Sequence, residues 1–206
     1  MLDYLISAFV TLVVVVDPIG LAPIFIAVTH GLPASAKRQV GLRASVIAGI
    51  ILAGAALAGD ALLRRLGIGL PAFQIAGGLL LFWIAAEMVY GSRSERESRD
   101  AEQAVEEHVR NIAAFPLAIP LMAGPGAIAA TVLLAGAAKT PERLTALIGV
   151  IVVVCVLTLL VFFFAGRIER VLGITGKIVL SRLLGIILAA LAVQYVIDGL
   201  REALKL

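Results

Sequence analysis

Two stretches of this chain, residues 111–138 and 144–166, contain no Asp, Glu, Lys or Arg. A helix of about 20 apolar residues crosses the hydrocarbon core of a bilayer, so each stretch is long enough to form a transmembrane helix. Four further apolar stretches have comparable length and few charges: residues 2–29, 44–63, 66–90 and 178–200. All six are too long and too continuous for barrel strands, which alternate over about ten residues. We therefore predict an all-α membrane protein with six transmembrane helices.

The composition excludes a soluble domain. Of the 206 residues, 61% are hydrophobic and 15% are charged, whereas about a quarter of the residues in a soluble domain are charged. A core of this size would leave too much apolar surface facing water, so we expect a lipid bilayer to cover it. Nucleic acid is not an expected partner, because Lys and Arg do not cluster with interleaved aromatic residues. A single cysteine, Cys155, excludes disulfide frameworks and multi-thiolate metal sites.

The distribution of Lys and Arg predicts the orientation of the chain, because cytoplasmic connections carry an excess of these residues. Connections one, three and five contain more of the 17 Lys and Arg residues than the opposite side does. They are Lys37, Arg38, Arg43, Arg93, Arg96, Arg99, Arg110, Arg167, Arg170, Lys177 and Arg182. We therefore expect these three connections in the cytoplasm and both termini outside.

An internal repeat is found when the sequence is compared with itself at an offset of 107 residues. At this offset Pro18 aligns with Pro125 and Glu87 with Gln194, and several glycines align with glycines at equivalent points of the crossings. Because each unit has three crossings, the second unit would be inverted in the membrane relative to the first. We predict two three-helix repeats, residues 1–91 and 111–206, joined by a cytoplasmic polar connection at residues 92–110. Inverted repeats are typical of secondary transporters.

Helices one and four are predicted to be interrupted near their centres. The interruptions are Asp17-Pro18-Ile19-Gly20 and Ala123-Gly124-Pro125-Gly126-Ala127. Proline breaks a helix, and an N-cap residue followed by proline is a signal for the start of a new one. Two helix N-termini would then face the bilayer centre, where their unpaired N–H groups attract anions. Simple proline kinks are the alternative, but two kinks at repeat-equivalent positions favour a site.

The predicted substrate site lies between these two breaks. A carboxylate at the bilayer centre costs at least about 2.5 kcal/mol, so Asp17 should face the interior, either protonated, paired or capping the following helix. The open N–H groups at the second break suit a carboxylate, whereas Asp17 suits an ammonium group or a proton. Together they suit a zwitterion such as an amino acid. The predicted site residues are Asp17, Pro18, Gly20, Gly124, Pro125, Gly126 and Gln194, the last as a hydrogen-bond donor between helices.

No enzyme is expected, because the chain lacks a Walker loop, a His-Glu-x-x-His motif and a Gly-x-Ser-x-Gly motif. We likewise expect no catalytic residue, no cofactor and no metal site, since neither histidine has neighbours at zinc spacing. The favoured function is a secondary transporter that moves a small polar solute by alternating access. A channel-like pore and a non-transporting membrane scaffold are the alternatives, and coupling to protons or sodium and homo-oligomerisation stay open.

Four motifs of the chain resemble those of the MarC family, in the same order and spacing and over nearly the whole chain. They are Asp17-Pro18-Ile19-Gly20-Leu21-Ala22-Pro23-Ile24-Phe25, Ile75-Ala76-Gly77-Gly78, the run from Pro116 to Ile128, and Ser181-Arg182-Leu183-Leu184-Gly185 leading to Gln194. The resemblance implies a six-span protein of the bacterial or archaeal inner membrane, related to multiple antibiotic resistance by name. It further implies a neutral amino-acid or small-metabolite transporter or exporter. The family usually has Asn at the position of Asp17, so proton coupling through this residue would not be a family-wide mechanism.

Overall fold

The computed structural model describes residues 1–91, 93, 96, 99, 113–138 and 140–204, and all regular secondary structure in this part of the chain is helical. The predicted polar connection at residues 92–110 lies outside the described residues, apart from Arg93, Arg96 and Arg99. The all-α prediction is therefore confirmed for the described part of the chain.

The first predicted crossing consists of two helices, α1 (Leu2–Val16) and α2 (Pro18–Val28). Asp17 separates the two helices and has a left-handed backbone conformation, with φ of 48° and ψ of 64°. Together the two helices form a span of 27 residues. The predicted interruption is confirmed, and Pro18 takes the first helical position, where its missing N–H group removes no hydrogen bond.

The second and third crossings are α3 (Ala34–Arg65) and α4 (Leu70–Tyr90). α3 begins well before residue 44, the predicted start of the apolar stretch. Lys and Arg form helices as readily as most apolar residues, so the helix continues beyond the part that lipid must cover. The turn between α3 and α4 contains Gly67 with φ of 71°, and α4 therefore begins after residue 66, where we predicted the third crossing to start.

The fourth crossing is less regular than predicted. It consists of η1 (Ala113–Met122), a helix of the π type, and α6 (Pro125–Ala137), and it is bent by 56° between them. The start of α6 at Pro125 confirms the predicted break. Within η1, however, Phe115 and Ile119 also have extended backbone angles. Each precedes a proline, whose ring disfavours the α conformation in the preceding residue.

The fifth and sixth crossings lie within α7 (Pro141–Leu204), which consists of two helical parts separated by a kink at Gly173. Gly173 has φ of 60° and ψ of −172°, a combination that is open essentially only to glycine. The charged connection between residues 166 and 178 is thus helical on both sides of the bend. The two parts of α7 form separate candidate spans, Pro141–Gly173 and Thr175–Leu204.

In the described part of the chain, five helical segments are long and apolar enough to cross a membrane. The bent pair of η1 and α6 provides a sixth if it is counted as one span. This number agrees with the six crossings predicted from the sequence.

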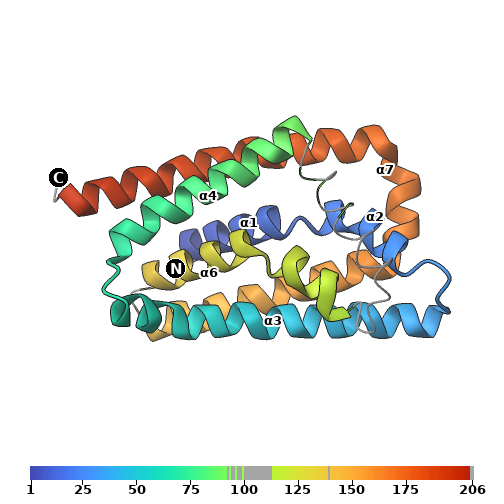
Figure 1. The fold of residues 1–206 in the computed structure, drawn as a ribbon, viewed down its shortest axis with the longest axis horizontal. Coiled ribbons are helices and arrows are strands. Elements are labelled where there is room, and N and C mark those ends of the chain that lie inside the picture. Colours follow the sequence, from blue (N-terminus) through green and yellow to red (C-terminus); the bar gives the residue numbers. More distant parts are fainter. Residues whose placement is uncertain (92, 94–95, 97–98, 100–112, 139, 205–206) are drawn as a thin grey trace.

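The two interrupted crossings lie inside the bundle. Figure 1 shows two outer layers, one made of α3 and the first part of α7 and the other of α4 and the second part of α7. The helices α1, α2 and α6 lie between these layers. Of the most apolar window in Leu2–Val28, 61% is buried, compared with 22% in Ala34–Arg65. The continuous helices therefore form the lipid-facing exterior and shield the two breaks.

Glycines allow α4 and the second part of α7 to pack closely against each other. A Cβ atom on Gly78 would lie 2.8 Å from the carbonyl oxygen of Ala192, and one on Gly185 would lie 2.9 Å from the Cβ of Met88. Any larger residue would separate these helices, because close approach of helix backbones in a membrane depends on small residues.

Candidate functional site

The first break is capped by its own side chain. Asp17 follows the last residue of α1 and precedes Pro18 of α2, and it is only 6% exposed. Its Oδ1 atom accepts a hydrogen bond of 3.1 Å from the backbone N–H of Gly20. Asp is tolerated in the left-handed region better than most residues. Of the roles left open for Asp17 in the sequence, the structure shows the cap of the Pro18 helix.

Gly20 makes room for this cap. A Cβ atom at position 20 would lie 2.7 Å from the carboxyl carbon of Asp17, which is closer than nonbonded carbon atoms approach. A side chain at this position would therefore displace the carboxylate and break its hydrogen bond with the N–H group of Gly20. Gly20 is one of the predicted site residues, and the structure gives it this spatial role.

The second break has no comparable cap. Gly124 is the N-cap residue of α6 with an extended backbone (φ −74°, ψ 173°), Pro125 follows at the first helical position, and no side chain among the described residues caps this end. The first N–H groups of a helix have no intrahelical partner, which leaves the amides of Gly126 and Ala127 without an acceptor from their own helix. The two breaks thus begin with the same proline signal but differ in what covers the new helix end.

The end of α1 and the start of α6 meet at one small cavity of about 50 Å³. A Cβ atom on Gly126 would lie 3.4 Å from Cγ1 of Val15 and would collide with Cδ1 of Ile84, so the start of α6 is in direct contact with α1 and α4. Figure 1 shows both breaks near the middle of the long dimension of the molecule. The cavity is lined by Val15, Ile84, Arg93, Arg96, Pro120, Leu121, Gly124, Pro125, Gly126 and Ala127.

Arg93 links this cavity to the first break. Its side chain is buried, with 7% of the residue exposed, and Nη2 donates a hydrogen bond of 2.7 Å to the carbonyl oxygen of Val15. Val15 lies in the last turn of α1, whose carbonyl groups have no intrahelical donor and attract cations. The guanidinium also lies close enough to Asp17 to attract its carboxylate. Arg93 therefore places a cation at the negative end of α1 and near the carboxylate of Asp17.

Arg93 is not among the predicted site residues, because in the sequence it stands among the charges that indicate orientation. A signal was available, since ionisable groups inside a membrane pair with one another and Asp17 needed a partner. In the structure, Gly91, with φ of 87°, ends α4 two residues before Arg93.

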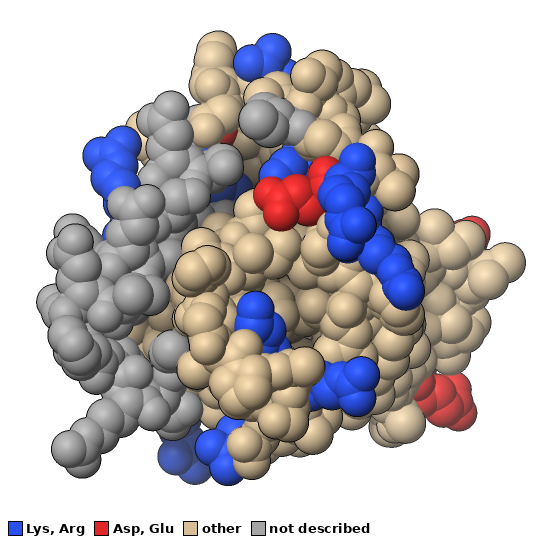
Figure 2. Space-filling view, turned by 90° about the vertical axis from the view of Figure 1, so that its right-hand side faces the viewer, with Lys and Arg blue, Asp and Glu red and all other residues tan. Residues whose placement is uncertain are grey.

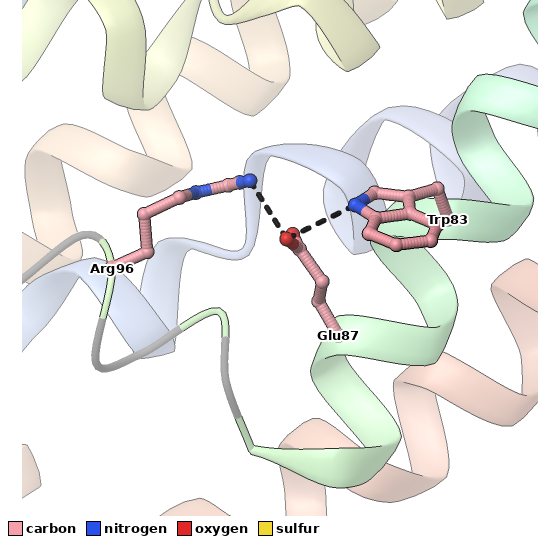
Figure 3. A network of polar contacts seen from close by, with 3 residues as sticks. All are labelled: Trp83, Glu87 and Arg96. Carbon is pink, nitrogen blue, oxygen red and sulfur yellow. Dashed lines mark hydrogen bonds and ion pairs between the residues drawn. The ribbon is translucent and has the colours of Figure 1, made fainter.

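A second arginine at the cavity belongs to a small polar network, which Figure 3 shows. Oε1 of Glu87 accepts a hydrogen bond of 2.8 Å from Nη1 of Arg96 and one of 3.2 Å from Nε1 of Trp83. Oε2 of Glu87 is buried and has no hydrogen-bond partner among the described residues. Because Arg96 also lines the cavity, Glu87 and Trp83 orient one of the two guanidinium groups found there.

Gln194 lies apart from the cavity. Its side chain is exposed on the second part of α7, and Nε2 donates a hydrogen bond of 2.8 Å to Oδ1 of Asp198. Residues four apart share one face of a helix, so this amide is satisfied within its own helix. The predicted hydrogen bond between helices is wrong, and the structure does not bring Gln194 to the other predicted site residues.

Metal binding has no candidate in the part of the chain that the structure describes. No group of three or more His, Cys, Asp and Glu side chains lies close enough there to hold a metal ion. The chemistry at the breaks is therefore that of buried charge, guanidinium groups and backbone amides.

Comparison of the sequence with known proteins identifies its family. The family model for MarC family integral membrane proteins matches residues 2–204. A UPF0056 membrane protein of Aquifex aeolicus is 37% identical over 200 residues, covering 97% of this chain and 94% of the relative. A UPF0056 membrane protein of Archaeoglobus fulgidus is 36% identical over 205 residues, covering 98% and 95%, and YhcE of Escherichia coli is 33% identical over 196 residues, covering 94% and 90%.

No solved structure matches this chain. The family model and the relatives cover nearly all of the chain, including both breaks and the helices around them. The chain therefore belongs to the MarC family of integral membrane proteins.

Proposed function

We propose that this protein is a secondary transporter or exporter of small, amino-acid-like metabolites and has no enzymatic activity. The observation that carries the proposal is the cavity at the start of α6, where two arginines line the same space as an uncapped helix N-terminus. We propose that the carboxylate of the substrate binds there.

The charges around the cavity favour an anionic group. Helix N-termini attract anions through their N–H groups and their dipole, and a guanidinium binds a carboxylate through two parallel hydrogen bonds. Asp17 is not among the residues that line the cavity, and its carboxylate is engaged with Gly20 and faces Arg93. These contacts support binding of a carboxylate at α6 more directly than binding of an ammonium group at Asp17.

The size of the cavity supports a transporter over an open pore. Its volume of about 50 Å³ accommodates a few water molecules, whereas sites for small molecules are typically about 300–1,000 Å³. A metabolite can therefore bind only if the surrounding helices move apart, as alternating access requires.

The helix boundaries support the proposal of an inverted repeat. α2 begins at Pro18 and α6 at Pro125, while α3 begins at Ala34 and α7 at Pro141, and both pairs are 107 residues apart. In Figure 1, α2 runs from its break toward the right and α6 runs from its break toward the left. Opposite directions of this kind are expected for half-helices in inverted repeats.

The arrangement of the chain ends supports the proposed location in the inner membrane with both termini outside. Figure 1 shows both termini on the left, whereas the connection between α2 and α3 and the bend of α7 lie on the right. Figure 2 views this right-hand end and shows many Lys and Arg side chains over it. An excess of these residues on one side favours the cytoplasm for that side.

The proposal is tested first by binding and then by transport. Purified protein would be screened by thermal unfolding against amino acids and related carboxylates, since a ligand that binds the folded state raises Tm. Each stabilising compound would then be tested for counterflow in proteoliposomes, where a carrier exchanges labelled for unlabelled solute. Downhill flux without counterflow would indicate a channel, and neither binding nor flux would indicate a scaffold.

Gly126→Val places the test at the proposed site, because a side chain there collides with Ile84 and covers the first amides of α6. We expect at least tenfold weaker binding of the identified solute. The matched control is Gly149→Val in α7, where an added Cβ meets no atom within 4 Å. Unchanged binding in a folded Gly126→Val variant would contradict a site at the start of α6.

A further inference from the structure

A second and much larger pocket, of about 650 Å³, lies away from the breaks. It is formed by α2, the first turns of α3 and the middle of α7, and its lining divides into an apolar aromatic part and a cationic part. This volume lies within the range of small-molecule sites. The cavity at the start of α6 shares no lining residue with it.

The aromatic part consists of phenylalanines from two helices. Phe25 of α2 stacks on Phe162 of α7, with ring centroids 4.4 Å apart and an angle of 9° between the rings. Phe163 and Phe164 continue this surface, and each is about half exposed. The stacked pair gives the pocket a rigid floor, beside which two further aromatic rings stay open to an apolar ligand.

The cationic part consists of Lys37 and Arg38 from α3 and Arg167 and Arg170 from α7. The guanidinium of Arg167 lies 5.7 Å from the centre of the Phe164 ring, which joins the cationic part to the aromatic part.

None of the four cations forms an ion pair with a carboxylate in the described part of the chain. Arg170 donates a hydrogen bond of 3.2 Å to the carbonyl oxygen of Gly166. The neighbouring acid, Glu169, is engaged by Lys177 at 3.4 Å. Four like charges around one pocket repel one another, and an anion bound between them would remove this repulsion.

The two parts lie at different depths relative to a bilayer. Phe162, Phe163 and Phe164 belong to the charge-free stretch of residues 144–166, whereas Arg167 follows that stretch directly. On α3, the two cations precede the apolar stretch of residues 44–63. The cations therefore lie at the level of lipid headgroups and the rings at the edge of the hydrocarbon layer.

We propose that this pocket binds one anionic phospholipid, with its phosphate among Lys37, Arg38, Arg167 and Arg170 and an acyl chain along Phe163 and Phe164. Basic pockets between transmembrane helices at a membrane surface bind acidic headgroups in this way. A phospholipid combines the two chemistries that the pocket presents, a negative head directly above an apolar chain. The site is independent of the proposed transport function.

The test measures lipid binding to the purified, delipidated protein in neutral detergent. Phosphatidylglycerol should raise Tm in a saturable manner, and phosphatidylcholine of the same chain length should not. Higher ionic strength should weaken the effect, because exposed charges are screened. Each Lys or Arg near a surface contributes about 1 kcal/mol to binding of acidic lipid, which is about fivefold in affinity. Arg167→Gln with Arg170→Gln should therefore weaken binding about 25-fold.

The control variant is Arg65→Gln with Arg201→Gln, which removes the same charge from two exposed positions that do not line the pocket. The affinity of this variant for phosphatidylglycerol should be unchanged. Lys37→Gln with Arg38→Gln tests the α3 side separately, should the α7 variant not fold.

Three results would overturn the proposal. The first is that phosphatidylcholine raises Tm as much as phosphatidylglycerol does. The second is that inorganic phosphate raises Tm as much, which would indicate a site for the free anion. The third is that the control variant loses as much affinity as the α7 variant.

Discussion

Replacing Arg93 by Gln is the most informative single perturbation of this structure. The variant loses the hydrogen bond from the guanidinium to Val15 and leaves the carboxylate of Asp17 without its nearby cation. Both residues are less than a tenth exposed, so bulk water reaches the groups that lose their partner only poorly. Leaving a buried hydrogen-bonding group without its partner costs about 1–3 kcal/mol. For a chain of this length that corresponds to a fall in Tm of several degrees.

The effect should depend on the charge of Asp17. Asp17→Asn keeps an acceptor for the cap and removes the negative charge. In the double variant no buried charge is left without a partner, so its free energy of unfolding should be higher than the sum of the single changes predicts. We expect a coupling of about 0.5–3 kcal/mol, the range measured for residues that interact.

Thermal unfolding of the four proteins in one detergent gives this coupling directly. Arg96→Gln is the matched control, because that arginine also lines the cavity but is half exposed in its ion pair with Glu87. In Arg96→Gln the Glu87 carboxylate keeps its hydrogen bond from Trp83, and a half-exposed guanidinium contributes less than a buried one, so a smaller fall in Tm than for Arg93→Gln is expected. If the changes at Arg93 and Asp17 were additive, or if Arg96→Gln were as destabilising as Arg93→Gln, the assignment of Arg93 as the counter-charge would be refuted.

Two further predictions concern the first break and the orientation. Gly20→Ala should destabilise the protein by about 1 kcal/mol or more, measured by thermal unfolding, because the added methyl group displaces the capping carboxylate; wild-type stability would show that the cap is dispensable. In a Cys155→Ala background, an impermeant maleimide should label Ala203→Cys on intact cells, and Ser35→Cys only after permeabilisation. The reverse pattern would invert the proposed orientation.

The breaks could be predicted because their signals are local. A proline at the first helical position and an N-cap residue before it act on the backbone of their own neighbours, so Asp17-Pro18 and Gly124-Pro125 are readable in any tertiary context. The same rule applied to Pro116 and Pro120 would have predicted the irregular η1. The predicted fourth crossing includes both prolines as part of a continuous helix, because an uninterrupted apolar stretch resembles one.

The partner of Asp17 could not be predicted from periodicity. Arg93 is close to Asp17 only because α4 returns the chain to the first break, and a guanidinium in a charged connection has the same sequence pattern whether it is buried or solvated. Gln194 illustrates the converse error. Its alignment with Glu87 suggested a shared role, but the face of α7 on which it lies offers Asp198 as a nearer partner.

The difference between the two breaks determines what each can bind. At the first break Asp17 supplies an anion from within the chain and Arg93 covers the opposing carbonyl end. At the second break the glycines supply no side chain, and the N-terminus of α6 faces a cavity that Arg93 and Arg96 also line. Inside a membrane, polar backbone groups require a partner. In the proposed mechanism the carboxylate of the substrate therefore accepts hydrogen bonds at the start of α6, as the carboxylate of Asp17 does at the start of α2. The two breaks differ because the start of α6 must release its anion, whereas Asp17 belongs to the chain.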